Sequence, residues 1–153
     1  MACIGKEEDQ VIDKMFSWCS TGDELVIIKK SIAEAKGRKG LYQEAVKCKG
    51  DLYSFKFIVS DYTGLNIKAS GELARELSML ARAHTQRERL IEKAKISYGI
   101  WIYTKEICNY PSHAKLNGKK FLIKRGAKVG FFKHIHTGGL VGCGCFSKPV
   151  LPF

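Results

Sequence analysis

Apolar residues recur at helical spacing in two stretches near the start of the chain. Residues 7–19 open with acidic side chains, and their apolar positions are Val11, Ile12, Met15, Phe16 and Cys19. Residues 23–36 repeat the pattern with Leu25, Ile28, Ile32 and Ala35. Gly37 follows the second stretch as a stop signal. Both stretches are therefore predicted to be short amphipathic helices.

The middle of the chain holds one ambiguous segment and one clear one. Residues 55–59 alternate well enough for a strand, and a buried helix is the alternative. After them comes the longest periodic run, with Ser70 as a suitable N-cap and Gly99 as a natural stop. Its apolar face carries Leu73, Leu77, Leu80, His84, Ile91 and Ala94. We expect one long helix here, with His84 packed or hydrogen-bonded rather than a ligand.

From Gly99 onward, short apolar runs separated by turn signals replace the helical pattern. Asn117-Gly118 is a strong signal for a tight turn between strands, because both residues accept positive φ. The sequence thus predicts an α+β protein: a helical region over residues 1–98, with a strand near 55–59 as the open point, and a small antiparallel β module over residues 99–153.

Length and composition restrict the class of protein. The chain has 153 residues, of which 45% are hydrophobic, which suits one domain with an appended module. Apolar runs such as the one around residues 100–103 are too short to span a membrane, and the N-terminus carries acids where a signal peptide would be basic and apolar. We expect a protein made in the cytosol, without a membrane partner and with reduced thiols.

The distribution of charge is uneven. The net charge is +11, yet every acidic residue lies at or before Glu106. Eight Lys and Arg residues follow it with no carboxylate among them. This excess favours a polyanionic partner, and pairing with the acidic N-terminal part is the alternative.

Nucleic acid fits the basic segment chemically. Cationic side chains alternate there with Phe121, Phe131 and Phe132, so phosphate contacts would lie beside faces on which bases stack. The candidate phosphate-binding residues are Lys119, Lys120, Lys124, Arg125 and Lys128. Alternatively, about half of the aromatic side chains form the inward face of the β module.

Side chains that bind metals also gather near the end of the chain. They are Cys108, His113, His134, His136, Cys143 and Cys145. Thiolate and imidazole groups suit zinc, which could hold together a module with a small core. However, Cys143-Gly144-Cys145 is spaced more tightly than the usual CxxC pair. Buried structural thiols with surface imidazoles remain the alternative to a metal site.

Catalysis has less support than binding. A metal-dependent nuclease needs carboxylates near its metal and its general base, and the segment has none after Glu106. We therefore expect no enzymatic activity, with a metal-assisted nuclease as the least favoured reading.

Four segments of the second half follow one another in a characteristic order. They are residues 81–86 (ARAHTQ), 98–104 (YGIWIYT), 111–121 (PSHAKLNGKKF) and 139–145 (GLVGCGC). This order resembles the phage head-morphogenesis (Mu F-like) minor capsid protein family. The family pattern implies a shared structural site at His113, Cys143 and Cys145, with Cys108 as a fourth member. It usually has Arg where this chain has Gly144.

The resemblance also implies a role. It suggests a minor structural protein of a phage or prophage head that acts at the portal or procapsid, binds portal or capsid protein, and contacts DNA in addition. Such a protein is found in the cytoplasm of a bacterial host and then in the virion. A small phage-derived protein that binds nucleic acid or interferes with the host is the second interpretation.

Overall fold

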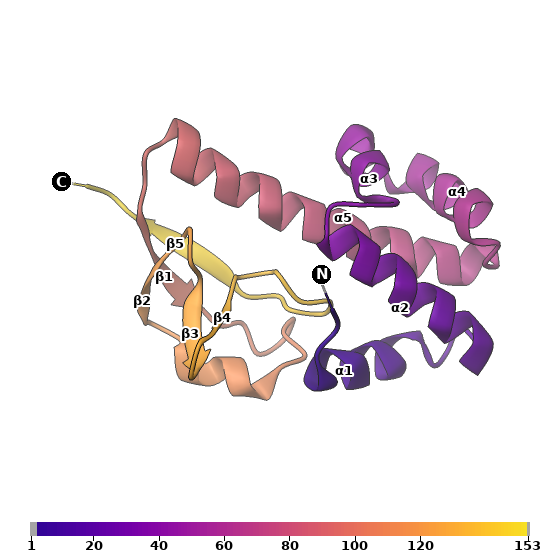
Figure 1. Cartoon of the computed structure of the whole chain (residues 1–153), viewed down its shortest axis with the longest axis horizontal. Helices are drawn as coiled ribbons and strands as arrows, with labels where there is room; N and C mark the ends of the chain where they lie inside the picture. Colours follow the sequence, from indigo (N-terminus) through magenta and orange to yellow (C-terminus); the bar gives the residue numbers. More distant parts are fainter. Residues whose placement is uncertain (1–2, 153) are drawn as a thin grey trace. The chain divides into compact units, whose positions relative to one another are not determined.

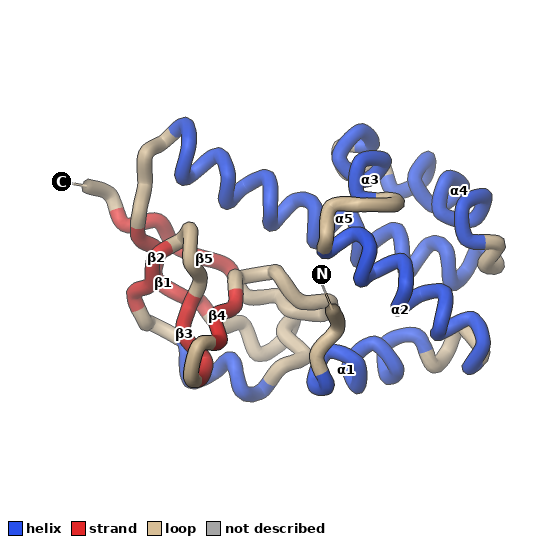
Figure 2. Tube along the Cα trace, viewed as in Figure 1, coloured by secondary structure: helices blue, strands red, loops and turns tan. Residues whose placement is uncertain are grey.

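The computed structural model describes residues 3–152, which form two compact units. The N-terminal unit is Met1–Arg82, the C-terminal unit is Ala83–Phe153, and the boundary falls inside one long helix. Helices make up the first unit, and short antiparallel strands characterise the second (Figure 1, Figure 2). The predicted α+β class is confirmed.

Four helices and the start of a fifth build the N-terminal unit. They are α1 (Lys6–Phe16), α2 (Gly22–Lys36), α3 (Tyr42–Cys48), α4 (Leu52–Thr63) and α5 (Ile67–Glu88). Its core contains fully buried side chains from several of these helices, including Ile12, Phe16, Ile28, Ile32, Phe55, Val59 and Leu73. The helical spacing of the first two predicted segments therefore reflects real packing faces. Within residues 3–152, no helix is both long and apolar enough to cross a bilayer.

A capping box explains where α2 begins. Thr21 accepts a hydrogen bond from the Glu24 backbone N–H at 3.4 Å, and the Glu24 carboxylate accepts one from the Thr21 N–H at 3.3 Å. The two bonds satisfy donors that the first helical turn leaves free. The polar segment between the two predicted helices therefore contains the N-cap of the second helix.

Residues 55–59 belong to helix α4, so of the two alternatives for this segment the buried helix is correct and the strand is not. The Asp51 carboxylate caps the helix by accepting from the Ser54 backbone N–H at 3.1 Å. Phe55 and Val59 are fully buried one turn apart, whereas Phe57 between them is 45% exposed. The apolar residues alternate in the sequence because Phe55 and Val59 share the buried face of the helix, while Phe57 is also apolar but lies on another face.

The long helix is confirmed, but both predicted ends are wrong. Asn66, not Ser70, caps α5 by accepting from the Ala69 N–H at 2.9 Å. At the other end, α5 passes into a π-helical turn, η1 (Arg89–Lys93), and the chain then leaves the helix through Lys95 at φ +56°. Gly99 lies inside the following strand.

Two small antiparallel sheets form in the C-terminal unit. Strand β1 (Tyr98–Ile102) lies between β2 (Lys120–Leu122) and β5 (Phe146–Val150). Strands β3 (Ala127–Gly130) and β4 (Lys133–Ile135) make a separate hairpin. Trp101, the fourth residue of β1, is fully buried, and so is Tyr110.

The Asn-Gly turn lies where it was predicted, but its geometry differs. It follows a short 3-10 helix, η2 (Pro111–Leu116), and does not join two strands directly. Asn117 has φ −54° and ψ 127°, only Gly118 has positive φ, and the Lys119 N–H donates to the Leu116 carbonyl at 2.9 Å. These values define a type II turn, which needs glycine only at its third position.

Candidate metal centre

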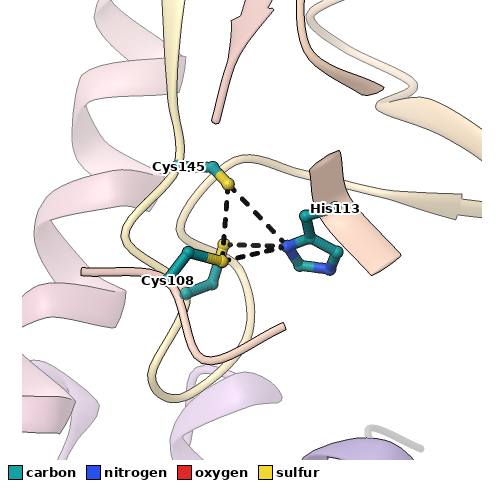
Figure 3. A group of neighbouring side chains, drawn as sticks. Cys108, His113 and Cys145 are labelled. Carbon is teal, nitrogen blue, oxygen red and sulfur yellow. Dashed lines mark hydrogen bonds between the residues drawn. The ribbon is translucent and has the colours of Figure 1, made fainter. Parts of the chain in front are cut away.

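Three separate segments of the C-terminal unit supply the predicted metal ligands. Cys108 lies in the loop after β1, His113 lies on η2, and Cys143 and Cys145 lie just before β5. Figure 3 shows Cys108, His113 and Cys145 with their ligand atoms turned toward one another. All four side chains are buried, with exposed fractions from 3% to 8%. Among residues 3–152 they form the one group of His, Cys and carboxylate side chains arranged for a metal ion.

Backbone and side-chain hydrogen bonds tie the ligand loops together. Asn109, next to Cys108, donates from its backbone N–H and its amide group to the Gly142 carbonyl, at 2.9 and 3.0 Å. The Tyr110 hydroxyl donates to the Val141 carbonyl at 2.6 Å. Two residues adjacent to one ligand therefore hold the loop that carries Cys143, and so the site does not depend on a metal alone for its shape.

The His113 imidazole is oriented by aromatic neighbours. Its ring stacks on Tyr110, with centroids 4.8 Å apart and planes 14° apart, and meets the edge of Trp101 at 5.6 Å. This packing turns Nδ1 toward the sulfur atoms, while Nε2 points away from them (Figure 3). A single imidazole nitrogen is thus presented to the cluster, as zinc coordination requires.

The ligand atoms lie close enough together to share one metal ion. His113 Nδ1 lies 3.5 Å from Cys108 Sγ, 3.5 Å from Cys143 Sγ and 3.8 Å from Cys145 Sγ. The sulfur atoms of Cys108 and Cys145 are 3.6 Å apart, and all four ligand atoms lie within 4.8 Å of one another.

These distances suit zinc. With Zn–S bonds of about 2.3 Å and Zn–N bonds of about 2.05 Å, tetrahedral sulfur–nitrogen edges are about 3.6 Å and sulfur–sulfur edges about 3.8 Å. Four of the six separations, those given above, differ from these edges by about 0.2 Å or less. The cluster of Cys108, His113, Cys143 and Cys145 can therefore bind a metal ion, and its chemistry is compatible with zinc.

The three thiols of the cluster differ in pKa. Hydrogen bonds, first from Cys143 and then from His113 and Cys108, lower the pKa of Cys145 despite its burial. The hydrogen bond to Cys145, together with burial, raises the pKa of Cys143, and burial raises that of Cys108. The cluster on its own thus favours a single thiolate, at Cys145. A divalent cation would favour deprotonation of the other two thiols.

Trp101 adds a further polar group beside the cluster. Its buried indole N–H has no hydrogen-bond partner at ordinary distance within the described chain, yet it helps to lower the pKa of Cys145. Donors that approach metal-bound sulfur tune affinity. The sequence pattern suggested no such role for Trp101 or Tyr110. Position in the chain could have indicated such a role: Trp101 lies in the central strand of the sheet, and Tyr110 lies two residues after Cys108.

Gly144 allows both cysteines of the tight pair to reach one centre. A Cβ at this position would lie 2.6 Å from the Ile107 carbonyl oxygen and 2.5 Å from an Ile107 side-chain carbon. The chain between the two cysteines therefore passes directly against the backbone that precedes Cys108. This contact accounts for glycine at position 144.

The other predicted residues lie outside this cluster. His134 is in β4, and His136 follows that strand. The five predicted phosphate-binding residues, Lys119, Lys120, Lys124, Arg125 and Lys128, are all exposed. Of the three interleaved aromatics, Phe121 is buried, whereas Phe131 and Phe132 are 90% and 93% exposed.

Comparison of the chain with protein-family models, with curated proteins and with solved structures gave no match.

Proposed function

We propose that the C-terminal unit is a binding module whose fold is held by one structural zinc ion. The observation that carries this proposal is the buried set of three thiols and one imidazole whose ligand atoms lie within 4.8 Å of one another. Catalytic zinc sites keep a coordination position for water or substrate, whereas four protein ligands are typical of structural sites. Bound zinc would cross-link three chain segments through these four residues.

Metal analysis tests the zinc. Protein purified without chelator should contain one zinc per chain, and removal of the metal should lower its melting temperature. Cys143→Ser should abolish stoichiometric zinc, whereas Cys48→Ser, which changes a thiol outside the cluster, should retain it. A metal-free preparation whose melting is unchanged by chelator would refute the proposal.

The same site argues for binding rather than catalysis. No carboxylate belongs to the cluster among the described residues, and its burial leaves a substrate little access to the metal. A metal-assisted nuclease would need both. We expect no cleavage of DNA or RNA with any divalent metal, and cleavage that His113→Ala abolishes would reverse this assignment.

We further propose that the protein is a minor structural component of a phage or prophage head, acting at the portal or procapsid. The order of its Trp-containing strand, its Ser-His turn and its terminal cysteine pair supports this role. The test is co-expression with a phage portal protein and with a phage capsid protein. Co-purification supports the role, and its absence with both partners removes it.

A second candidate is a small nucleic-acid-binding protein that is not a capsid component. The uneven charge favours it: residues 83–153 carry thirteen Lys and Arg against three Glu, or +10 of the net +11. None of the five predicted phosphate-binding residues makes an ion pair with a described carboxylate of that unit. DNA binding lost on charge reversal at Lys119, Lys120 and Lys124, without portal association, would favour this candidate.

A further inference from the structure

The tip of the β3–β4 hairpin displays two aromatic rings to solvent. Phe131 and Phe132 form the whole connection between the strands, and they are the most exposed large hydrophobic side chains described. Their centroids are 5.6 Å apart and their planes are inclined by 65°. Because the rings are not stacked face to face, each keeps a face open to a ligand.

The backbone at the tip makes this arrangement unusual. Phe132 has φ +62°, in the left-handed region where two-residue hairpin connections usually place Gly or Asn. A bulky aromatic in that conformation is strained, and its ring contributes nothing to the core. Phe132 therefore does not stabilise the fold of the hairpin. Its presence at the tip, next to the exposed Phe131, is better explained if the two rings bind a ligand.

Cations accompany the rings along the hairpin. Lys128 and Lys133 lie on the two strands close to the tip, and Lys124 and Arg125 lie in the turn that leads into β3. The four residues of β3 lie between Arg125 and the two rings, a length of about 13 Å. The charges thus follow the length of the hairpin and do not form one ring around its apolar end.

We propose that Phe131 and Phe132 stack on the bases of single-stranded nucleic acid while the hairpin lysines contact its phosphates. This inference rests on the proposal that the C-terminal unit contacts DNA, and it adds the form of the nucleic acid and the element that binds it. Aromatic faces beside a track of cations are the usual recognition elements for single strands. In a duplex the bases already stack on each other, so the rings would first have to separate a base step.

A membrane surface is the competing partner for an apolar tip flanked by lysines. An inserting tip gains from cations only near the depth of the lipid headgroups. Lys124 and Arg125 lie at the far end of β3 from the rings, where a phosphate chain would reach them and a headgroup layer around the tip would not. The distribution of charge therefore favours the polymer.

Fluorescence anisotropy with a labelled thymidine oligonucleotide tests the proposal in zinc-loaded, full-length protein. Phe131→Ala and Phe132→Gly should each weaken binding by about 5- to 150-fold at every salt concentration, because one stacking contact is lost. The slope of affinity against salt should stay unchanged. Lys128→Ala should instead make that slope shallower by about 0.7, the value for one phosphate contact on a single strand.

Two controls separate stacking from loss of fold. Tyr53→Ala removes an exposed aromatic from the N-terminal unit and should leave binding unchanged. Phe131→Trp should retain affinity, and its fluorescence should be quenched by the bound oligonucleotide. Zinc content should match the wild type in Phe131→Ala and Phe132→Gly. Melting should not fall in either, since the rings make no core contacts.

Four results would overturn the inference. Wild-type affinity in both Phe variants would remove the tip from the site while leaving charge-driven DNA binding intact. Equal or tighter binding of a duplex of the same length would remove the single-strand preference. Binding to vesicles containing phosphatidylserine, lost in the Phe variants and without oligonucleotide binding, would assign the tip to a membrane. No binding of any nucleic acid at low salt would remove the DNA contact as well, whereas association with portal protein would still be testable.

Discussion

Trp101 connects the core of the C-terminal unit to the cluster of thiols. It packs within β1, meets the His113 ring edge-on, and directs its indole N–H toward Cys145. The four ligands could be predicted from residue chemistry and motif order, because only Cys and His side chains offer suitable atoms. Trp101 could not, since its role depends on the strand that carries it and the loop that returns beside it.

Replacing Trp101 by Phe should weaken zinc binding by about 10- to 100-fold, because the N–H that faces the Cys145 sulfur is removed while most of the ring remains. Competition with a chromophoric chelator measures the change. Trp18→Phe, which alters a half-exposed tryptophan in the other unit, is the control and should leave the affinity unchanged. Equal affinities in the two variants would show that the indole does not influence the metal.

Gly144→Ala should impair the metal site without changing any ligand. The new methyl would lie 2.6 Å from the Ile107 carbonyl oxygen, so the loop carrying Cys143 and Cys145 must shift away from Cys108. We expect zinc affinity to fall by at least about 10-fold, as for other changes next to metal ligands. Gly22→Ala has open space for a Cβ and serves as the matched control. A fully loaded Gly144→Ala protein would mean that the loop adapts.

His136 should make the protein less stable in mild acid. Burial, followed by the charge of Arg87 and the proximity of His84 and His134, lowers its pKa to about 4. The unfolded state therefore takes up the proton first, near its pKa of about 6.5, and stability falls as the pH drops from there toward 4.

At pH 5 this residue should reduce the free energy of unfolding by about 1–2 kcal/mol relative to pH 7, after allowance for its partial exposure. His136→Gln should remove that part of the loss while the contribution of the thiols stays the same in both proteins. Urea unfolding at the two pH values measures the difference. Parallel losses in variant and wild type would contradict the assignment.

At the scale of elements, the long apolar periodicity predicted a helix correctly. Where local capping bonds decide the structure, the pattern placed the start of that helix wrongly and left the segment at 55–59 open between strand and helix. The long helix was evident from its apolar face, but Asn66 and Lys95 set its ends. The segment at 55–59 alternates in sequence, yet the Asp51 cap begins a helix there. Propensity alone cannot weigh one capping bond against a five-residue pattern, and here the cap and the buried helical face prevailed.

Gly126 fixes the base of the β3–β4 hairpin. It has φ +92°, and a Cβ there would lie 2.5 Å from the Ile135 carbonyl oxygen. Gly118 also has positive φ, at +80°, but has open space around its missing Cβ. Gly118→Ala should therefore cost about 1 kcal/mol from the backbone conformation, and Gly126→Ala about 2 kcal/mol or more.

Urea unfolding in a Trp18→Phe background tests this pair of variants, because Trp101 then reports on the C-terminal unit alone. Gly126→Ala should also weaken oligonucleotide binding, since the hairpin carries the exposed rings. Equal destabilisation by the two substitutions would show that the contact with Ile135 relaxes without cost.

For the whole molecule, the two units are similar in length but very different in net charge. The N-terminal unit has thirteen basic and twelve acidic residues, and Lys29 bridges Asp9 and Asp13 within it. The C-terminal unit carries nearly all of the net charge on a smaller core, so repulsion between its cations opposes folding. Zinc held by the four closely spaced ligands would offset that disadvantage, since the binding energy of a structural zinc becomes folding energy.

Removal of the metal should therefore affect the two units differently. After chelation, we expect amides of β1, β2 and β5 to lose protection from hydrogen exchange, because these strands adjoin the ligand loops. Amides of α1, α2 and α4 should keep their protection, since their buried faces pack within the N-terminal unit. Hydrogen-exchange mass spectrometry resolves both groups of peptides in one sample. Uniform loss of protection would mean that the units unfold as one, and unchanged protection in β1 would mean that the strands fold without zinc. The sequence already indicates this difference in protection between the units. All four ligands lie after Glu106, whereas the helices whose apolar faces pack against one another lie before it.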